Sequence, residues 1–234
     1  MTGRLYGVGV GPGDPDLITL KALKVLKEAD LIAYPSPETG ESLARSIADQ
    51  HIPKGREEFA IRMPMLTDQF PVQEVYDNAA QRIGDALNRG RIVAVLCEGD
   101  PFFYGSFLYL FGRLAGDHTV EVIPGVSSLM ACAAALSAPL AARNDILTVL
   151  PAPLDDETLT LRFAEAEAIA IVKVGRHFER VRTLLRENGL ADDARYIERA
   201  TMVDQKILRL DEVDAVTVPY FSMVLVHRRG TAWL

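Results

Sequence analysis

Several residue types are scarce in the sequence, and each scarcity excludes a class of protein. The 234 residues include only two cysteines, Cys97 and Cys132, both in apolar surroundings and without CxxC spacing. This favours reduced, buried thiols over a disulfide and is typical of a cytoplasmic protein. The four histidines are scattered without ligand spacing, so no metal site is expected.

Positive charge and long apolar runs are also lacking. The formal net charge of −7 repels nucleic acids and anionic membranes, and no basic patch with interleaved aromatics occurs. One uncharged stretch, 122–142, reaches membrane length, but Pro124, Gly125 and Pro139 interrupt it. The apolar helix that remains, 129–136, is too short to cross about 30 Å of hydrocarbon. The opening MTGRLYG has no apolar segment of a signal peptide. We therefore expect no nucleic-acid or membrane partner.

What the sequence does contain is the pattern of an α/β fold. Strand-like runs alternate with helical ones in the first half, which predicts parallel βαβ units. The segment 92–97 is apolar at every position, as in a parallel strand covered on both faces, and is placed at the sheet centre. The other predicted strands are 5–10, 30–34 and 120–123, and the predicted helices are 16–29 and 75–89.

The pattern changes after about residue 142. Two strand-like runs, 145–150 and 168–175, flank a helix, and an amphipathic helix then ends at Gly189. Three strands with little room for helices follow, which indicates antiparallel pairing; they are 194–201, 206–210 and 220–228. The chain is therefore predicted to form two α/β lobes, 1–142 with a mostly parallel sheet and 143–234 with a mixed sheet, and a cleft between them.

The glycine-rich turn after the first strand resembles a dinucleotide-binding loop but fails its test. A Gly-x-Gly-x-x-Gly/Ala fingerprint counted from Gly7 ends on Pro12, and counted from Gly9 it ends on Asp14. NAD binding is therefore not expected. The turn does supply Asp14 as N-cap and Pro15 as the first residue of a helix, a structural role that needs no ligand.

Two further predicted strands end in similar turns, CEGDPFFYGS and PGVSS. The carboxyl ends of parallel strands share one edge, where ligands bind, so the three turns indicate one site. Asp100 and Pro101 are expected to start a capped helix. The aromatic run 102–104 is either an apolar wall for a flat heterocycle or core. Ser127 and Ser128 either cap the following helix or bind a ligand.

Four segments, in order over nearly the whole chain, resemble the tetrapyrrole methylase family of S-adenosylmethionine-dependent methyltransferases, which act on corrin precursors. They are VGVGPGDPDLITLKA, EGDPFFYGS, IPGVSS and ERATMVDQKI. Within the family, the sequence is most similar to the subgroup that methylates precorrin-2 at carbon 20 in cobalamin biosynthesis. The similarity lies in Glu98 before the Gly-Asp-Pro, in Tyr104-Gly105-Ser106 after it, and in the segment IVKVGRHFERV.

The resemblance implies a class III methyltransferase-like fold, a homodimer and S-adenosylmethionine bound between the lobes. The implied cofactor contacts, carried over by motif, are Pro12, Gly99, Asp100, Phe103, Tyr104, Ser127 and Ser128 in the first half and Val174, Ala200, Ser222 and Met223 in the second. The cofactor already carries an electrophilic methyl group, so orientation is the main catalytic device.

A hydrogen must leave the methylated carbon, and Asp14 and Glu98 are the candidate bases, with helix capping or a structural hydrogen bond as the alternative role of each. A precorrin carries many carboxylates, and the candidate cations for them are Arg62, Arg143, Arg176 and His177, each of which could instead be a solvated surface charge. A methylase acting at another position, or on a modified histidine of a translation factor, and a non-catalytic tetrapyrrole- or nucleotide-binding module stay open. No feature indicates whether the substrate contains cobalt.

Overall fold

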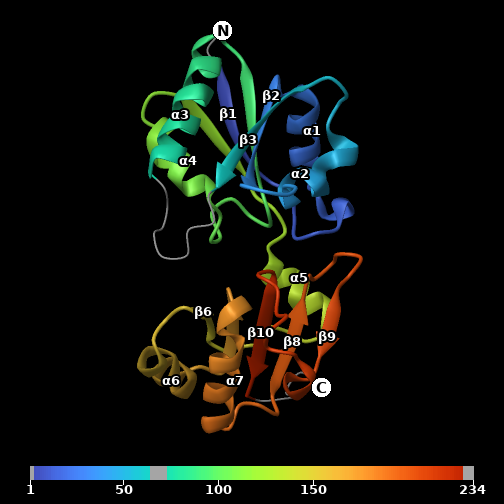
Figure 1. The fold of residues 1–234 in the computed structure, drawn as a ribbon, viewed down its shortest axis with the longest axis vertical. Coiled ribbons are helices and arrows are strands. Elements are labelled where there is room, and N and C mark those ends of the chain that lie inside the picture. The colour runs from blue at the N-terminus through green and yellow to red at the C-terminus, as the bar shows by residue number, and fades with distance from the viewer. Residues whose placement is uncertain (1–2, 64–72, 229–234) are drawn as a thin grey trace. The chain divides into compact units, whose positions relative to one another are not determined.

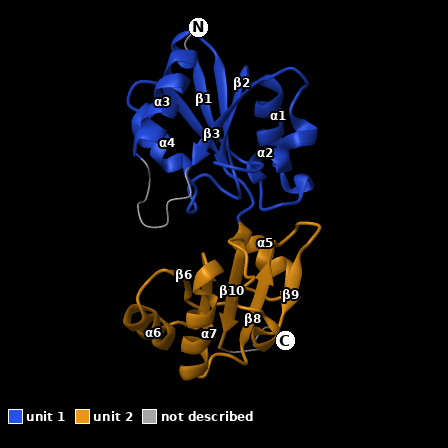
Figure 2. Cartoon of the chain, in the orientation of Figure 1, with its two compact units in different colours: residues 1–127 blue, residues 128–234 orange. Residues whose placement is uncertain are grey.

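The computed structural model describes residues 3–63 and 73–228, and these form two compact units. The units are Met1–Ser127 and Ser128–Leu234, coloured separately in Figure 2. Helix α5 (Ser128–Ala135) belongs to the second unit because it packs against a strand of that unit, β10 (Ser222–His227). The predicted domain boundary after residue 142 stays a prediction.

The first unit is built on a parallel sheet of five strands in the order β3-β2-β4-β1-β5. Strand β4 lies at its centre, which confirms the position predicted for the apolar segment 92–97. The strands are β1 (Arg4–Gly9), β2 (Leu31–Pro37), β3 (Glu57–Met63), β4 (Ile92–Cys97) and β5 (Thr119–Ile123).

Helices cover both faces of this sheet (Figure 1). Side chains alternate along β4, so Val93 and Val95 pack toward α3 (Gln73–Asn88) and α4 (Phe107–Leu114). Ala94 and Leu96 pack on the opposite face, toward α1 (Leu20–Glu28) and α2 (Leu43–Ala48). Burial on both faces explains why β4 is apolar at every position.

Two local predictions in the first unit were wrong, and two of its elements were not predicted. The helix predicted over 16–29 is a short 3-10 turn, Pro15–Leu17, followed by α1, because Thr19 caps the α-helix by accepting from the N–H of Ala22 at 3.1 Å. Asp100 does not start a helix, since α4 begins only at Phe107. Strand β3 and helix α2 were not predicted.

The second unit contains a mixed sheet in the order β6-β7-β10-β8-β9, as predicted. Strands β6 and β7 are parallel, whereas β10 runs antiparallel to β7 and β8, and β9 antiparallel to β8. Helices α6 and α7 contribute Phe163 and Phe178 to its core. The remaining bounds are β6 (Leu147–Pro151), α6 (Asp156–Glu165), β7 (Ala168–Val172), α7 (Phe178–Glu187), β8 (Ala194–Glu198) and β9 (Lys206–Leu208).

Both cysteines are buried and unbridged, as predicted. Burial raises the pKa of the Cys132 thiol to about 12, which keeps it protonated. Within the described residues, no helix has the length and apolar character needed to span a bilayer.

Candidate cofactor-binding site

The loops after β1 and β4 meet at the point where the strand order of the first sheet reverses. The chain crosses from β1 over β4 to reach β2, and from β4 over β1 to reach β5, in opposite directions along the sheet. Ligands of open α/β sheets bind at such a switch point, beside the carboxyl ends of the strands. The three sequence-predicted turns therefore lie where this fold places a ligand.

A backbone bridge joins two of these loops. The N–H of Gly99 donates to the carbonyl of Gly11 at 2.8 Å, and the N–H of Gly11 donates back at 3.3 Å. Both residues have positive φ, +83° for Gly11 and +63° for Gly99, a conformation that disfavours side chains. The bridge thus depends on glycine at both positions.

Asp100 joins the loop after β4 to the loop after β5. Its Oδ1 accepts from the N–H of Phe102 at 2.9 Å, and its Oδ2 accepts from the N–H of Gly125 at 3.0 Å. The side chain predicted to contact the cofactor thus binds two backbone amides and fixes the spacing of two loops, in place of the predicted helix cap.

Glycine is required where the three loops touch. A Cβ added to Gly125 would lie 2.0 Å from the carbonyl oxygen of Gly99 and 2.8 Å from the Cα of Gly9. A Cβ on Gly9 would lie 2.6 Å from the Cα of Gly125. These neighbours are backbone atoms, so neither position has room for any side chain.

The two candidate bases occupy different settings. Asp14 accepts from the N–H of Asp16 at 2.9 Å and caps the 3-10 turn, so the structural role predicted for it is present. Glu98 is largely buried, and its Oε1 accepts from the N–H of Ala44 at 3.3 Å, at the start of α2. Burial raises the pKa of Glu98, because the charged form loses solvation.

The aromatic run 102–104 divides between two packing groups, and none of its side chains is fully buried. Phe102 is 51% exposed but packs on Phe107 and Phe111 of α4, with ring centroids 6.2 and 5.1 Å away. Phe103 and Tyr104 form an edge-to-face pair at 5.1 Å, and Tyr104 has a left-handed backbone, φ +56°. The predicted apolar wall is therefore available from Phe103 and Tyr104, whereas Phe102 belongs to the α4 cluster.

The predicted cofactor residues of the second unit gather at one end of its sheet. Val174 follows β7, Ala200 follows β8, and Ser222 and Met223 begin β10. The Oγ of Ser222 accepts from the N–H of Gly175 at 3.3 Å and donates to the carbonyl of Pro219 at 2.8 Å. Ser222 thus connects the loop after β7 to the residues that lead into β10.

The predicted substrate cations are not all brought together. Arg176 and His177 directly follow Val174 and share its end of the second sheet. Arg143 lies at the opposite end, because Asp145, two residues further along the chain, hydrogen bonds to His227, the last residue of β10, at 3.0 Å. In the first unit, Arg62 on β3 donates to the carbonyl of Pro37 at 3.2 Å.

Comparisons with known proteins identify the family. The family model described as tetrapyrrole (corrin/porphyrin) methylases matches residues 4–214. The chain belongs to the tetrapyrrole methylases. The family resemblance predicted from the four motifs is thereby confirmed.

Individual relatives refine this membership. The chain is 38% identical over 232 residues to the precorrin-2 C(20)-methyltransferase of a Sinorhizobium species, covering 96% of this chain and 95% of that protein. It is 41% identical to the cobalamin biosynthesis protein CobIJ of Mycobacterium tuberculosis H37Rv, but spans only about half of it, 46% of its length. The solved cobalt precorrin-4 methyltransferase CbiF has the same fold, with 26% identity, 96% and 94% coverage of the two chains and a TM-score of 0.73.

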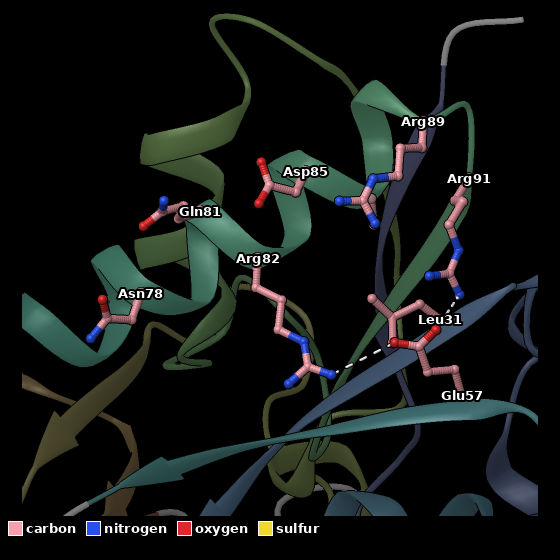
Figure 3. A pocket seen from close by; sticks show the side chains of 9 residues that line it. Leu31, Glu57, Asn78, Gln81, Arg82, Asp85, Arg89 and Arg91 are labelled. Atoms are coloured by element: carbon pink, nitrogen blue, oxygen red, sulfur yellow. Dashed lines mark ion pairs between the residues drawn. The ribbon is translucent and has the colours of Figure 1, made fainter.

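A polar pocket of about 270 Å³ in the first unit of this methylase lies away from the switch point. It is lined by α3 and by residues at the amino ends of β2, β3 and β4 (Figure 3). Glu57 lies between Arg82 and Arg91, with nitrogen–oxygen distances of 3.6 and 2.8 Å, so its carboxylate already compensates two of the pocket's cations. None of the predicted site residues lines this pocket.

Metal ligation is not indicated in the part of this methylase that the structure describes. Residues 3–63 and 73–228 contain no group of three or more His, Cys, Asp or Glu side chains placed to hold a metal ion. The switch-point loops instead offer backbone groups, the hydroxyls of Ser127 and Ser128, the rings of Phe103 and Tyr104, and the carboxyl groups of Asp14, Glu98 and Asp100.

Proposed function

We propose that this chain is an S-adenosylmethionine-dependent C-methyltransferase that methylates precorrin-2, or its cobalt form, at carbon 20 in cobalamin biosynthesis. The observation that carries the proposal is the joining of three loops at the switch point through Gly11, Gly99 and Asp100, in a tetrapyrrole methylase. The 38% identity to a full-length precorrin-2 C(20)-methyltransferase supports the position specificity.

The switch-point loops suit an adenosyl group in chemical type. Phe103 and Tyr104 provide flat apolar surface, and the hydroxyls of Ser127 and Ser128 provide hydrogen-bonding groups at the start of α5. Pro12 and Gly99 provide backbone, and Val174, Ala200, Ser222 and Met223 are the proposed contacts from the second unit. When bound, the cofactor supplies an electrophilic methyl group on its sulfonium.

The chain's own contribution to catalysis is orientation and the handling of one proton. The loops must hold the acceptor carbon in line with the methyl group, about 3–3.5 Å away. Asp14 and Glu98 are the proposed bases, and the raised pKa of Glu98 makes its ionised form a stronger base. An unchanged single-turnover methylation rate in Glu98→Gln would exclude Glu98 from this role.

The carboxylates of the substrate require cations in a chain of net charge −7. We assign this role first to Arg176, with His177 beside it as a neutral hydrogen-bonding partner, because both share the end of the second sheet with Val174 and Ser222. Arg62 and Arg143 stay candidates, although Arg143 lies at the far end of that sheet. Charge reversal at Arg176 should raise the KM for the tetrapyrrole.

We further propose that the protein acts as a homodimer in the cytoplasm. The support is the family resemblance and the two unbridged, buried thiols, which suit a reducing compartment. Sedimentation equilibrium of the purified chain tests the assembly, and a monomer mass at micromolar concentration would contradict it.

Calorimetric titration with S-adenosylhomocysteine is the first test. Binding near one site per chain is expected, and no detectable binding would contradict the proposal. Methyl transfer from labelled cofactor to precorrin-2, with and without cobalt, then tests the reaction. Binding of cofactor and tetrapyrrole without transfer would indicate a non-catalytic module, and product methylated elsewhere would indicate a methylase of different position specificity.

A further inference from the structure

Two consecutive aromatic residues, Tyr220 and Phe221, are exposed immediately before β10. Their side chains lie at the surface, 67% and 41% exposed, and their rings form an edge-to-face pair with centroids 5.1 Å apart. Aromatic side chains present a large apolar area with little conformational freedom to lose, which is why they are enriched where proteins bind ligands and partners. The pair therefore offers a preformed apolar surface.

Backbone contacts place this pair beside the predicted cofactor residues of the second unit. The carbonyl of Phe221 accepts from the N–H of Arg199 at 2.8 Å, at the end of β8. Gly175, after β7, faces Tyr220 so closely that an added Cβ would lie 3.7 Å from its Cα. Ser222, which follows the pair, binds the N–H of the same Gly175. The pair thus lies at the end of the sheet that carries Val174 and Ser222.

Positive charge flanks the pair on the loop after β7. Arg176 and His177 follow Gly175, and Arg176 is exposed. Burial, and to a lesser extent the nearby guanidinium groups of Arg176 and Arg180, lower the pKa of His177, so its neutral imidazole can hydrogen bond to a carboxylate while Arg176 carries the charge. On the neighbouring loop, Arg199 pairs with Asp204 at 2.8 Å. This end of the second sheet therefore combines apolar rings with cationic groups, although the chain as a whole is acidic.

We propose that Tyr220 and Phe221 form the stacking surface for the pyrrole rings of the substrate, with Arg176 and His177 receiving its peripheral carboxylates. A tetrapyrrole has this combination of conjugated apolar rings and an anionic rim, so its chemistry matches the surface in both respects. The inference rests on the proposed function, and it adds two substrate-binding residues that the family resemblance does not supply.

The test separates substrate binding from cofactor binding and from folding. We expect Tyr220→Ala and Phe221→Ala each to raise the KM and the Kd for precorrin-2 about fivefold or more, the range of one lost aromatic contact. The Kd for S-adenosylhomocysteine should stay within twofold, and Tyr220→Phe should restore the wild-type KM, because it retains the ring. Leu161→Ala is the matched control, since Leu161 is 53% exposed on α6.

Each other outcome would overturn the inference or the proposed function. An unchanged KM and Kd for precorrin-2 in both alanine variants would overturn the inference, and so would an equal change in Leu161→Ala. A fall in assembly mass in Tyr220→Ala without a change in KM would assign the pair to a subunit contact instead. A wild-type protein that binds precorrin-2 but never methylates it would refute the proposed function, while the Kd values would still decide the role of the pair.

Discussion

Each sheet has one end that carries the predicted cofactor residues, and the loops at that end are joined differently in the two units. In the first unit, backbone packs directly on backbone, and Gly9, Gly99 and Gly125 leave no room for a side chain where their loops touch. In the second unit, the backbone bond between Arg199 and Phe221 is supplemented by side chains: Ser222 binds the loop after β7, and within β8 the hydroxyl of Tyr196 donates to buried Glu198 at 2.5 Å.

This difference separates a rigid region from an adaptable one. The backbone atoms of Gly9, Gly99 and Gly125 are closely packed, so a shift of one loop must displace the strand ends beside it. This packing restricts the first-unit loops to one geometry. Connections through side chains, in contrast, permit changes of residue around them without a steric clash. We infer that the first-unit loops are suited to an invariant ligand such as a cofactor, and the second-unit end to a substrate-specific surface such as Tyr220 and Phe221.

Adding a methyl group to the first-unit junction should have the largest effect. In Gly125→Ala, the new Cβ would meet the carbonyl of Gly99 and the backbone of Gly9. Overpacking against backbone should lower the free energy of unfolding by about 3 kcal/mol or more. Chemical denaturation measures the loss, and calorimetry should detect no binding of S-adenosylhomocysteine.

Two variants give the comparison its controls. Gly112→Ala adds the same methyl group at an exposed position of α4, where nothing lies within 4 Å, and should stabilise the protein by about 0.5–1 kcal/mol. Ser222→Ala removes the linking hydroxyl of the second unit and should cost about 1–2 kcal/mol. If Gly125→Ala lowered the free energy of unfolding no more than Ser222→Ala does, the proposed difference between the two units would be wrong.

Removing the carboxylate that joins two first-unit loops should have an intermediate effect. Asp100→Ala leaves the N–H groups of Phe102 and Gly125 without this acceptor. We expect a loss of about 2 kcal/mol in stability and at least tenfold weaker binding of S-adenosylhomocysteine, measured by denaturation and calorimetry. Asp155→Ala is the control, because it removes a carboxylate that caps α6 and should lower stability without affecting cofactor affinity.

The smallest predicted effect depends on pH. Burial raises the pKa of Glu98 above the ordinary value of 4.5, so the protonated carboxyl favours folding. This stability is fully present below the ordinary pKa and is lost as the pH rises through the raised pKa. Glu98→Gln retains an acceptor for Ala44 without a charge, so its Tm relative to wild type should increase from about pH 4 to about pH 8. A Tm difference independent of pH would show that Glu98 is not desolvated.

The central features of the fold could be predicted because their signals are local. The unbroken apolar run of β4 specifies a strand covered on both faces, and the three closely spaced strands at the end of the chain specify antiparallel pairing. Strand β3 was missed because it is an edge strand, with most of its side chains only partly buried, so no clear alternation marks it. The start of α1 was misplaced because Asp14 and Thr19 both cap turns, one of them 3-10.

The parts of the candidate site that are formed by short sequence motifs could be predicted. The parts that depend on contacts between distant segments could not. The three turns could be placed at one sheet edge, but the bond from Asp100 to Gly125 joins segments far apart in sequence and has no local signal. The far position of Arg143 follows from a hydrogen bond between Asp145 and His227, which likewise leaves no trace in sequence. Tyr220 and Phe221 are visible in the sequence as adjacent aromatics, but only the structure shows that both are exposed.

The position of β1 has a consequence for how the chain is made. Val8 pairs with Leu96 on one side and with Ile123 on the other, so both neighbours of this strand are synthesised long after it. During translation β1 must remain unpaired until β4 has left the ribosome, and such long-range pairing slows folding. An early strand with two open edges is also prone to aggregation, so we expect the first unit, rather than the locally paired β8 and β9, to limit the yield of folded protein on rapid expression.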